Sequence, residues 1–283
     1  MSNGSPRSLR PLLLLETSTL LSGAGNGAAL IILPWLVLEL TASPVAAGVV
    51  AAATAATRLF SSVVSGAIVD LLGRRRTAIT ADVLSAGSLV SLPVVDLLLG
   101  LNLAWVVGLA ILGSMFDPAG VNARETMLPA AAGRARWTLD RVNGVHEATW
   151  GAAFLIGPGA GGLLIAWIGA VEGLVVTAAC FAASAGLVSL VRLPHTDRPQ
   201  GDVRMSGIWS ETLDGLRFVR REPLLLAVAG VTVAVLALYM PIEEVLLPVH
   251  FVELDQPGRL GLTLIALSGG GIVGALVHGA LAA

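Results

Sequence analysis

Long apolar runs separated by short polar segments dominate the chain. A helix needs roughly 20 consecutive apolar residues to cross a hydrocarbon core of ~30 Å. Asp117 and Pro118 make one such segment less regular than the others, because they fall near its end. The pattern predicts an all-α membrane protein with eight transmembrane helices. The predicted helices are 12–38, 45–69, 77–99, 103–121, 142–167, 171–191, 224–249 and 260–283.

The polar segments between these helices differ in charge from one side of the membrane to the other. Fifteen arginines lie before the first helix or in the loops after the second, fourth and sixth helices, whereas the opposite loops contain only Arg259. Cytoplasmic loops of membrane proteins carry an excess of arginine and lysine. The distribution therefore predicts a cytoplasmic N-terminus, with every even-numbered helix ending in the cytoplasm.

The longest polar stretch, residues 195–222, follows the sixth helix. It divides the chain into a six-helix half (1–192), a central cytoplasmic segment (193–222) and the first two helices of an incomplete second half (223–283). Apolar residues recur near one helical face of the central segment, which predicts a short amphipathic helix at the membrane surface. These residues are Ile208, Trp209, Leu213, Leu216 and Val219.

Composition agrees with a membrane protein and excludes several kinds of chemistry. The chain is 55% hydrophobic and 13% charged, with a mean hydropathy of +0.84, whereas an ordinary soluble domain is about a quarter charged. All 17 residues of the lysine and arginine class are arginine, so neither a P-loop nor a pyridoxal Schiff base can form. The single cysteine, Cys180, allows no intramolecular disulfide.

Two matches to known site motifs fail when their surroundings are considered. Gly157, Gly159 and Gly162 fit the dinucleotide pattern G-x-G-x-x-G, but an apolar helix surrounds them and the next acidic residue, Glu172, comes too early to bind a ribose. The stretch HEATW (146–150) begins like a zinc-protease motif but has tryptophan where the second histidine belongs. We therefore expect no metal, no cofactor, no enzymatic activity and no nucleic-acid partner.

The loop between the second and third helices contains a motif that topology alone does not explain. It reads GAIVDLLGRRRTAI, and its arginines suit a cytoplasmic loop, but its aspartate and glycines need another reason. The spacing G-x-x-x-D-x-x-G-R-R resembles the cytoplasmic loop motif of the major facilitator superfamily. The resemblance implies a latch between inward-facing and outward-facing states, with one glycine allowing close helix packing and the other a sharp turn. The matching residues are Gly66, Asp70, Gly73, Arg74 and Arg75.

A second stretch, IGPGAGGLL in the fifth helix, is similar to the G-P-x-x-G-G motif associated with antiporters of that superfamily. It matches at Gly157, Pro158, Gly161 and Gly162. Glycine and proline inside a membrane helix also indicate close packing and a kink. Together with the stretches LPWLVLELTASP (33–44) and LDGLRFVRREPLL (213–225), this stretch resembles the branch of bacterial macrolide and siderophore exporters, which have twelve spans. The resemblance implies the first eight of twelve helices, in the plasma (inner) membrane of a bacterium.

Polar and charged residues inside the predicted helices mark a candidate substrate or proton site. A charge at the bilayer centre costs roughly 2.5–3.5 kcal/mol on insertion scales, so it normally faces a partner or a cavity. By helix rise, Arg58 lies about 16 Å deep, while Asp82 and Glu16 lie about 6–8 Å from the cytoplasmic face. We expect Arg58 to pair with one of these acids, either as a structural ion pair or as a site where proton and substrate exclude each other. Asn26 lies past the midplane of the first helix and completes the candidate set.

These features predict a secondary active transporter that exports small amphipathic molecules in exchange for protons, by alternating access. The substrate site would lie near the midplane between the two halves, and Glu243 and Glu244 would line a wet extracellular vestibule. Two alternatives remain: an uptake permease with the same fold, and a non-transporting truncated membrane protein. The expected partners are a small-molecule substrate, protons and the lipid bilayer.

Overall fold

The computed structural model describes residues 7–193 and 217–281, with side chains as far as residue 270. All regular secondary structure within these ranges is helical. The helices are α1 (Arg10–Thr41), α2 (Pro44–Leu72), α3 (Arg74–Leu99), α4 (Leu103–Ser114), α5 (Asp117–Glu125), α6 (Leu128–Ala135), α7 (Leu139–Ile168), α8 (Ala170–Ser189), α10 (Pro223–Pro241), the π-helix η1 (Ile242–Leu246), α11 (Leu247–Glu253) and α12 (Pro257–Leu281).

Seven helical stretches of the described chain are long and apolar enough to cross a membrane, and they match the first seven predicted helices. They are Arg10–Thr41, Pro44–Leu72, Arg74–Leu99, Leu103–Ala135, Leu139–Ile168, Ala170–Ser189 and Pro223–Glu253. The eighth predicted helix coincides with α12, which has 25 residues. The predicted all-α membrane fold is therefore confirmed.

The fourth membrane stretch is not the single helix predicted for residues 103–121. Helix α4 ends at Ser114, a turn follows, and α5 begins at Asp117. Pro118 explains this break, because proline has no N–H to donate and its ring clashes with the carbonyl four residues earlier. Asp117 consequently stands in the first turn of α5, where the helix dipole favours a carboxylate.

Local sequence signals also account for the tight connections between the long helices. The Ser43 hydroxyl accepts a hydrogen bond from the Ala46 N–H at the start of α2, and the Thr138 hydroxyl accepts one from the Arg141 N–H at the start of α7. Gly73 has a φ angle of 85° and turns the chain from α2 into α3. A side chain would be strained in this conformation, so the sharp turn predicted at Gly73 is confirmed.

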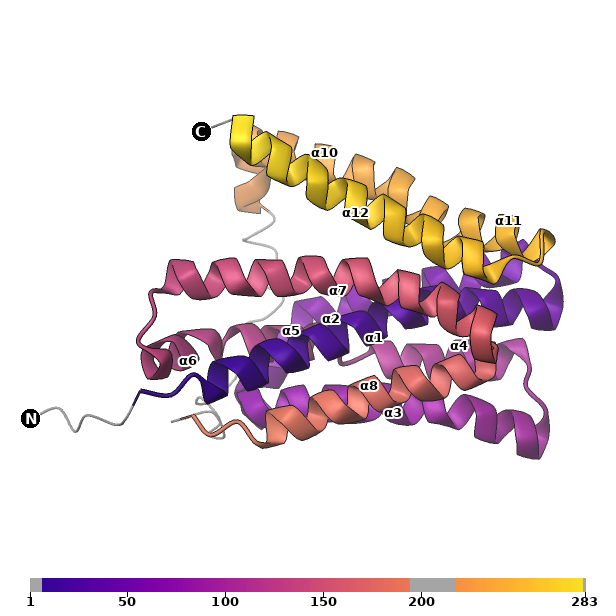
Figure 1. The fold of residues 1–283 in the computed structure, drawn as a ribbon, viewed down its shortest axis with the longest axis horizontal. Helices are drawn as coiled ribbons and strands as arrows, with labels where there is room; N and C mark the ends of the chain where they lie inside the picture. Colours follow the sequence, from indigo (N-terminus) through magenta and orange to yellow (C-terminus); the bar gives the residue numbers. More distant parts are fainter. Residues whose placement is uncertain (1–6, 194–216, 282–283) are drawn as a thin grey trace, which may run out of the picture.

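Helices α1 to α8 form six membrane stretches, here called the six-helix part. Helix α1 runs through the middle of this part (Figure 1). It packs against α7 and α8, while α3 packs against α8, α4 and α5. The largest buried side chains of this core include Ile31 and Ile32 of α1 and Leu174 and Phe181 of α8. This packing holds the polar residues of α1 at defined positions inside the bundle.

Helices α10 and α12 form a pair that leans away from the other helices (Figure 1). They approach the six-helix part at the end marked by α11 and diverge from it toward their other end. Helix α12 packs against α7, and η1 and α11 contact α1 and α2. Helix α10 is exposed along nearly its whole length.

Most of the predicted central segment lies outside the described residues. Of the five apolar residues predicted to form an amphipathic face, only Val219 is described, in a short helical turn just before α10.

Candidate functional site

Arg58 of α2 lies at the centre of a polar cluster inside the bundle. Its Nη2 atom lies 3.4 Å from Oδ2 of Asp117 on α5 and donates a hydrogen bond to Oδ1 of Asn26 on α1 at 3.2 Å. The hydroxyl of Ser85 on α3 lies 3.0 Å from the other carboxylate oxygen of Asp117. The side chain of Asp117 is 11% exposed and that of Arg58 is 31% exposed. Four helices thus contribute to one charged cluster.

The cluster is ordered by contacts within its own helices. The Asn26 amide nitrogen donates to the carbonyl of Ser22, one turn earlier on α1, at 3.2 Å, which leaves the amide oxygen facing Arg58. Asp117 is presented by the break between α4 and α5. Discontinuous helices of this kind occur in membrane proteins where the freed backbone groups line a cavity or are buried in protein.

Two cavities share this cluster. The first has an empty volume of about 490 Å³ and lies among α1, α2, α3 and α4. The second has an empty volume of about 1270 Å³ and lies among α1, α2, α5, α7, α10 and η1. Both are lined by Asn26, Leu30, Arg58, Asp117 and Glu244.

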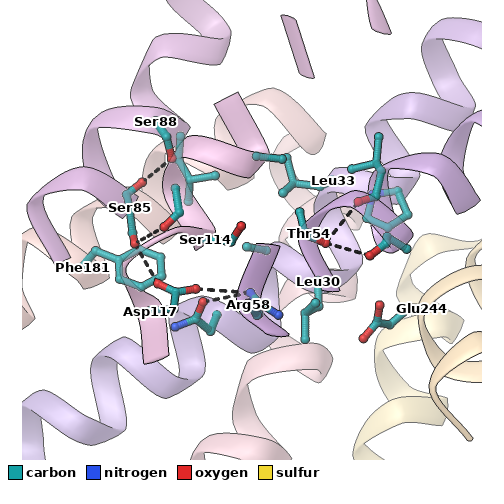
Figure 2. Close-up of a pocket in the computed structure, with 18 residues that line it drawn as sticks. Leu30, Leu33, Thr54, Arg58, Ser85, Ser88, Ser114, Asp117, Phe181 and Glu244 are labelled. Carbon is teal, nitrogen blue, oxygen red and sulfur yellow. Dashed lines mark hydrogen bonds and ion pairs between the residues drawn. The ribbon is translucent and has the colours of Figure 1, made fainter. Parts of the chain in front are cut away.

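The walls of the cavities carry charge on opposite sides. Figure 2 shows Arg58 and Asp117 together on one side and Glu244 on another, with Leu30 between them. Glu244 and Glu243 belong to the π-helix η1, a rare element that is frequent at functional sites. The sequence places these glutamates in an outer vestibule, but the structure places both on the wall of the larger cavity that also contains Arg58.

The prediction that Arg58 pairs with Asp82 or Glu16 is wrong. Asp82 of α3 instead forms a buried ion pair with Arg124 of α5, and it accepts a hydrogen bond from the Ser22 hydroxyl at 2.9 Å. The side chains of Arg124 and Asp82 are only 4% and 2% exposed. Depth along a helix suggested the wrong partner, because it does not say which neighbouring helix a side chain faces.

Glu16 also has a partner that the sequence does not suggest. Both of its carboxylate oxygens lie 3.3 Å from Nδ1 of His146 on α7. The Nε2 atom of His146 accepts a hydrogen bond from the Trp150 indole at 3.1 Å. The imidazole is buried, whereas the sequence suggests only a polar residue near the cytoplasmic mouth of the fifth helix.

The sequence therefore did not indicate the partners of Arg58, Asp82 and Glu16, which are Asp117, Arg124 and His146. Asp117 could have been included, because it is an acid beside a proline within a predicted membrane helix. Arg124 was assigned to a loop, since the predicted fourth helix ended three residues before it. No signal in the sequence identifies His146 as a partner of Glu16, 130 residues earlier.

The motif between α2 and α3, here called the switch motif, lies at one end of the bundle. It consists of Gly66, Asp70, Gly73, Arg74 and Arg75. Arg74 donates to the carbonyl of Thr126 at 3.1 Å, and Arg75 donates to the carbonyls of Val188 and Ser189 at the end of α8. These contacts tie the loop to the C-terminal ends of α5 and α8. Cations are also favoured near such carbonyl ends of helices.

The other two residues of the switch motif have no close neighbours of the expected kind. Gly66 is exposed, and a Cβ atom there would have no neighbour within 4 Å, so the close packing expected at this glycine is not made by the described residues. Asp70 is half-buried and makes no hydrogen bond or ion pair with any part of the chain that the structure describes.

The antiporter-like motif of α7 packs closely on two sides, as predicted for its glycines. A Cβ atom on Gly157 would lie 2.8 Å from the carbonyl oxygen of Ala24, and one on Gly161 would lie 2.9 Å from that of Ala28, so these two glycines face α1. Pro158 lies against α1 as well, at Gly27. Gly162 faces the opposite side, where a Cβ atom would lie 2.6 Å from the Cα of Gly261 on α12.

Comparison with known proteins assigns the family. Residues 15–283 match the family description "Major Facilitator Superfamily". The chain belongs to this superfamily. The match confirms the resemblance inferred from the two motifs and agrees with the helical membrane fold.

Similar members of the superfamily include curated bacterial proteins. The chain is 44% identical over 269 residues to the "Multidrug efflux pump Tap" of Mycolicibacterium fortuitum, which covers 94% of this chain and 66% of that protein. It is 40% identical over 275 residues to the protein of the same name from Mycobacterium tuberculosis, and the alignment covers 96% of this chain and 66% of that protein. It is 27% identical over 248 residues to an uncharacterized transporter of the superfamily from Sinorhizobium fredii, and the alignment covers 84% of this chain and 58% of that protein. The chain thus spans about two thirds of the length of the curated relatives that it matches.

No metal site accompanies this superfamily fold in the part of the chain that the structure describes, where no group of three or more His, Cys, Asp or Glu side chains is arranged to hold an ion.

Proposed function

We propose that the protein is a secondary active transporter that exports small amphipathic molecules across a bacterial inner membrane, driven by protons. Two relatives at 40–44% identity are named multidrug efflux pumps, which supports the direction of transport. Residues 1–192 would form the N-terminal half, with a cytoplasmic N-terminus, and the later helices would belong to the second half. The substrate would bind between the two halves, as is usual for transporters built from repeats.

The observation that carries this proposal is the position of the Arg58–Asp117 pair on the wall of the large cavity. About a third of the Arg58 side chain is exposed, and both Arg58 and Asp117 line the cavity, so a molecule in the cavity can reach the pair. The same cavity is lined by Trp150, Phe154, Met240 and Glu244. Aromatic and methionine side chains suit apolar groups of varied shape, and the charged residues suit the polar end of an amphipathic molecule.

Efflux of a fluorescent amphipathic cation, ethidium, from preloaded cells tests the proposal with the full-length gene product. We expect Arg58→Ala and Asp117→Asn each to lower the initial efflux rate at least tenfold at equal protein levels. Arg76→Ala is the matched control, because Arg76 is exposed at the start of α3 and lines neither cavity.

The double variant Arg58→Met with Asp117→Leu separates a transport role from a structural role. If the pair only holds the helices together, removing both charges restores both expression and efflux. We expect normal expression without efflux, and full efflux in the double variant would overturn the proposed site.

Faster ethidium entry in energised cells would indicate an uptake permease, and an inactive wild type would indicate a non-transporting protein.

A further inference from the structure

A second titratable cluster lies behind the wall of the large cavity, separate from the Arg58–Asp117 pair. Its centre is His146, whose side chain is 7% exposed. Nδ1 of the imidazole faces both carboxylate oxygens of Glu16 at 3.3 Å. Nε2 accepts the hydrogen bond of the Trp150 indole at 3.1 Å and lies 4.0 Å from Oε1 of Glu125.

The hydrogen bond from Trp150 determines which proton the imidazole carries. An indole N–H can only donate, so Nε2 must be without a proton in this arrangement. The proton of the neutral ring is then on Nδ1, where it is donated to Glu16. A second proton on Nε2 would face the indole N–H as a clash of two donors.

Glu125 provides the alternative partner for a protonated Nε2. Its carboxylate is within 4.0 Å of that atom, so a small shift of the side chain completes a charge-assisted hydrogen bond. Binding of a proton would therefore exchange the partner of Nε2 from Trp150 to Glu125. In the charged form, the imidazolium would have a carboxylate on each side.

The charged groups around His146 favour such an exchange. Glu16 reaches the ring from α1 and Glu125 from α5. Arg124, also on α5, lines the small space beside His146 and Trp150, but its charge is already paired with Asp82 of α3. The next residue along α7, Glu147, is exposed, so two carboxylates remain to compensate a bound proton.

The exchange would be felt in the large cavity, because both alternative partners of Nε2 line it. Trp150 and Glu125 are on the cavity wall, whereas His146 is not. The Trp150 ring also lies against that of Phe154, with ring centroids 6.0 Å apart. A proton on His146 would release the indole and engage the Glu125 carboxylate, which changes both the shape and the charge of this wall.

We propose that His146, between Glu16 and Glu125, is a proton-binding site that controls the wall of the cavity by exchanging Trp150 for Glu125 as the partner of Nε2. The binding of the proton stands on the geometry of the cluster. Its effect on transport rests on the proposed function.

Nitrogen-15 NMR of histidine-labelled full-length protein in lipid nanodiscs tests the site without any transport measurement. The His146 resonances are assigned by their loss in His146→Gln. At high pH we expect the signature of a neutral ring protonated on Nδ1, and at low pH that of the imidazolium. Absence of any titration of His146 between about pH 5 and pH 9 would overturn the proposal.

Two variants should move the titration of His146 in opposite directions. Glu125→Gln removes the acceptor of the charged form, so we expect the titration to move about one unit toward lower pH. Trp150→Phe removes the donor that holds the neutral form while keeping an aromatic ring, so we expect a move toward higher pH. Glu147→Gln is the matched control and should leave the titration unchanged. A histidine that stays neutral throughout this pH range would give neither shift, and equal shifts in Glu125→Gln and Glu147→Gln would also contradict the proposed exchange.

A transport measurement then separates this inference from the proposed function. Efflux of ethidium by His146→Gln should lose the pH dependence shown by the wild type. If the wild type itself does not transport ethidium, the proposed function is wrong for this substrate, while the NMR titration still decides whether the proton site exists. If Glu125→Gln does not fold, the shift in Trp150→Phe tests the same exchange.

Discussion

Among the described residues, three pairs of charged or titratable side chains lie inside the bundle, and each pair joins two helices. Arg58 pairs with Asp117, Arg124 with Asp82, and His146 with Glu16. A charge without a partner is expensive within a bilayer, so each of these residues constrains how its two helices pack. The pairs differ in exposure: the Asp82–Arg124 pair is enclosed, whereas Arg58 opens to a cavity.

The Asp82–Arg124 pair predicts a large loss of stability when one partner is removed. Breaking a buried ion pair costs roughly 3–5 kcal/mol, because it leaves an uncompensated buried charge. We expect Arg124→Met alone to reduce the yield and melting temperature of detergent-solubilised protein sharply. The double variant Arg124→Met with Asp82→Leu should recover most of both, which thermal unfolding followed by size-exclusion chromatography would measure.

The exposed arginine Arg76 provides the control for this prediction. Arg76→Met should leave the melting temperature nearly unchanged, since Arg76 is exposed at the start of α3. If Arg124→Met is as stable as Arg76→Met, the buried pair does not stabilise the fold. If the double variant stays as unstable as Arg124→Met, the Ser22 and Ser184 hydrogen bonds of the pair matter more than its charges.

At the scale of elements, helix α7 connects the six-helix part with the C-terminal pair. Its glycines remove side chains from two faces, so that α1 and α12 both approach closely. Small residues are typical of contacts between membrane helices, since they allow the backbones to pack together. The G-P-x-x-G-G motif therefore has a packing role on both sides, whatever its part in transport.

Gly162 provides a sharp test of the contact between α7 and α12. In Gly162→Ala the new Cβ atom would overlap the backbone of Gly261, which cannot move as a flexible side chain would. Overpacking of this kind costs about 1–3 kcal/mol, so we expect a lower melting temperature. Gly151→Ala, in the same helix with no atom within 4 Å of the new Cβ, should be neutral or slightly stabilising because alanine is the better helix former. Equal effects of the two substitutions would show that the contact is not closely packed.

The turn between α2 and α3 leads to a prediction about switching. Because Asp70 has no partner among the described residues, we propose that it acts in a different state of the transport cycle. Asp70→Asn in the full-length protein should abolish efflux while leaving ethidium binding, measured by fluorescence anisotropy, within about twofold of the wild type. Asp140→Asn, at an exposed site in the first turn of α7, is the control. Equal losses of binding and efflux in Asp70→Asn would point to a direct ligand role or to misfolding.

At the scale of the whole molecule, the C-terminal pair meets the six-helix part near α11 and diverges from it at the opposite end (Figure 1). The large cavity is lined by Met240, Glu243 and Glu244 at the junction of α10 and η1 on one side, and by residues of α1, α2, α5 and α7 on the other. Alternating access is largely a rocking of one half against the other. If the N-terminus is cytoplasmic, this arrangement is closed on the outer side and open toward the cytoplasm.

Single cysteines test that orientation in intact cells after Cys180 is replaced by serine. We expect a cysteine in place of Arg220, before α10, to resist a membrane-impermeant maleimide, because the arginine-rich loops should be cytoplasmic. A cysteine in place of Glu253, at the exposed end of α11, should react. Both positions should react in permeabilised cells. The opposite pattern in intact cells would reverse the topology.

The sequence by itself determined the order and approximate bounds of the membrane helices and the superfamily. Each of these depends on local composition: the length of an apolar run, the short motif around Asp70 and Gly73, and the glycines around Pro158. Such signals act within a few residues, so they can be read without knowing how the helices pack. The side of the membrane on which the arginines lie stays a prediction that the cysteine experiment tests.

Only the tertiary structure decided which buried charges meet. Depth along a helix is one coordinate, and it placed Arg58, Asp82 and Glu16 near one another. The partner also depends on the rotation of each helix about its axis and on which neighbours it packs against. Rotation turns Asp82 toward Arg124 and Glu16 toward His146, and the proline break in the fourth membrane stretch brings Asp117 to Arg58. These contacts join residues 42 to 130 positions apart, and only the packing of the whole bundle brings them together.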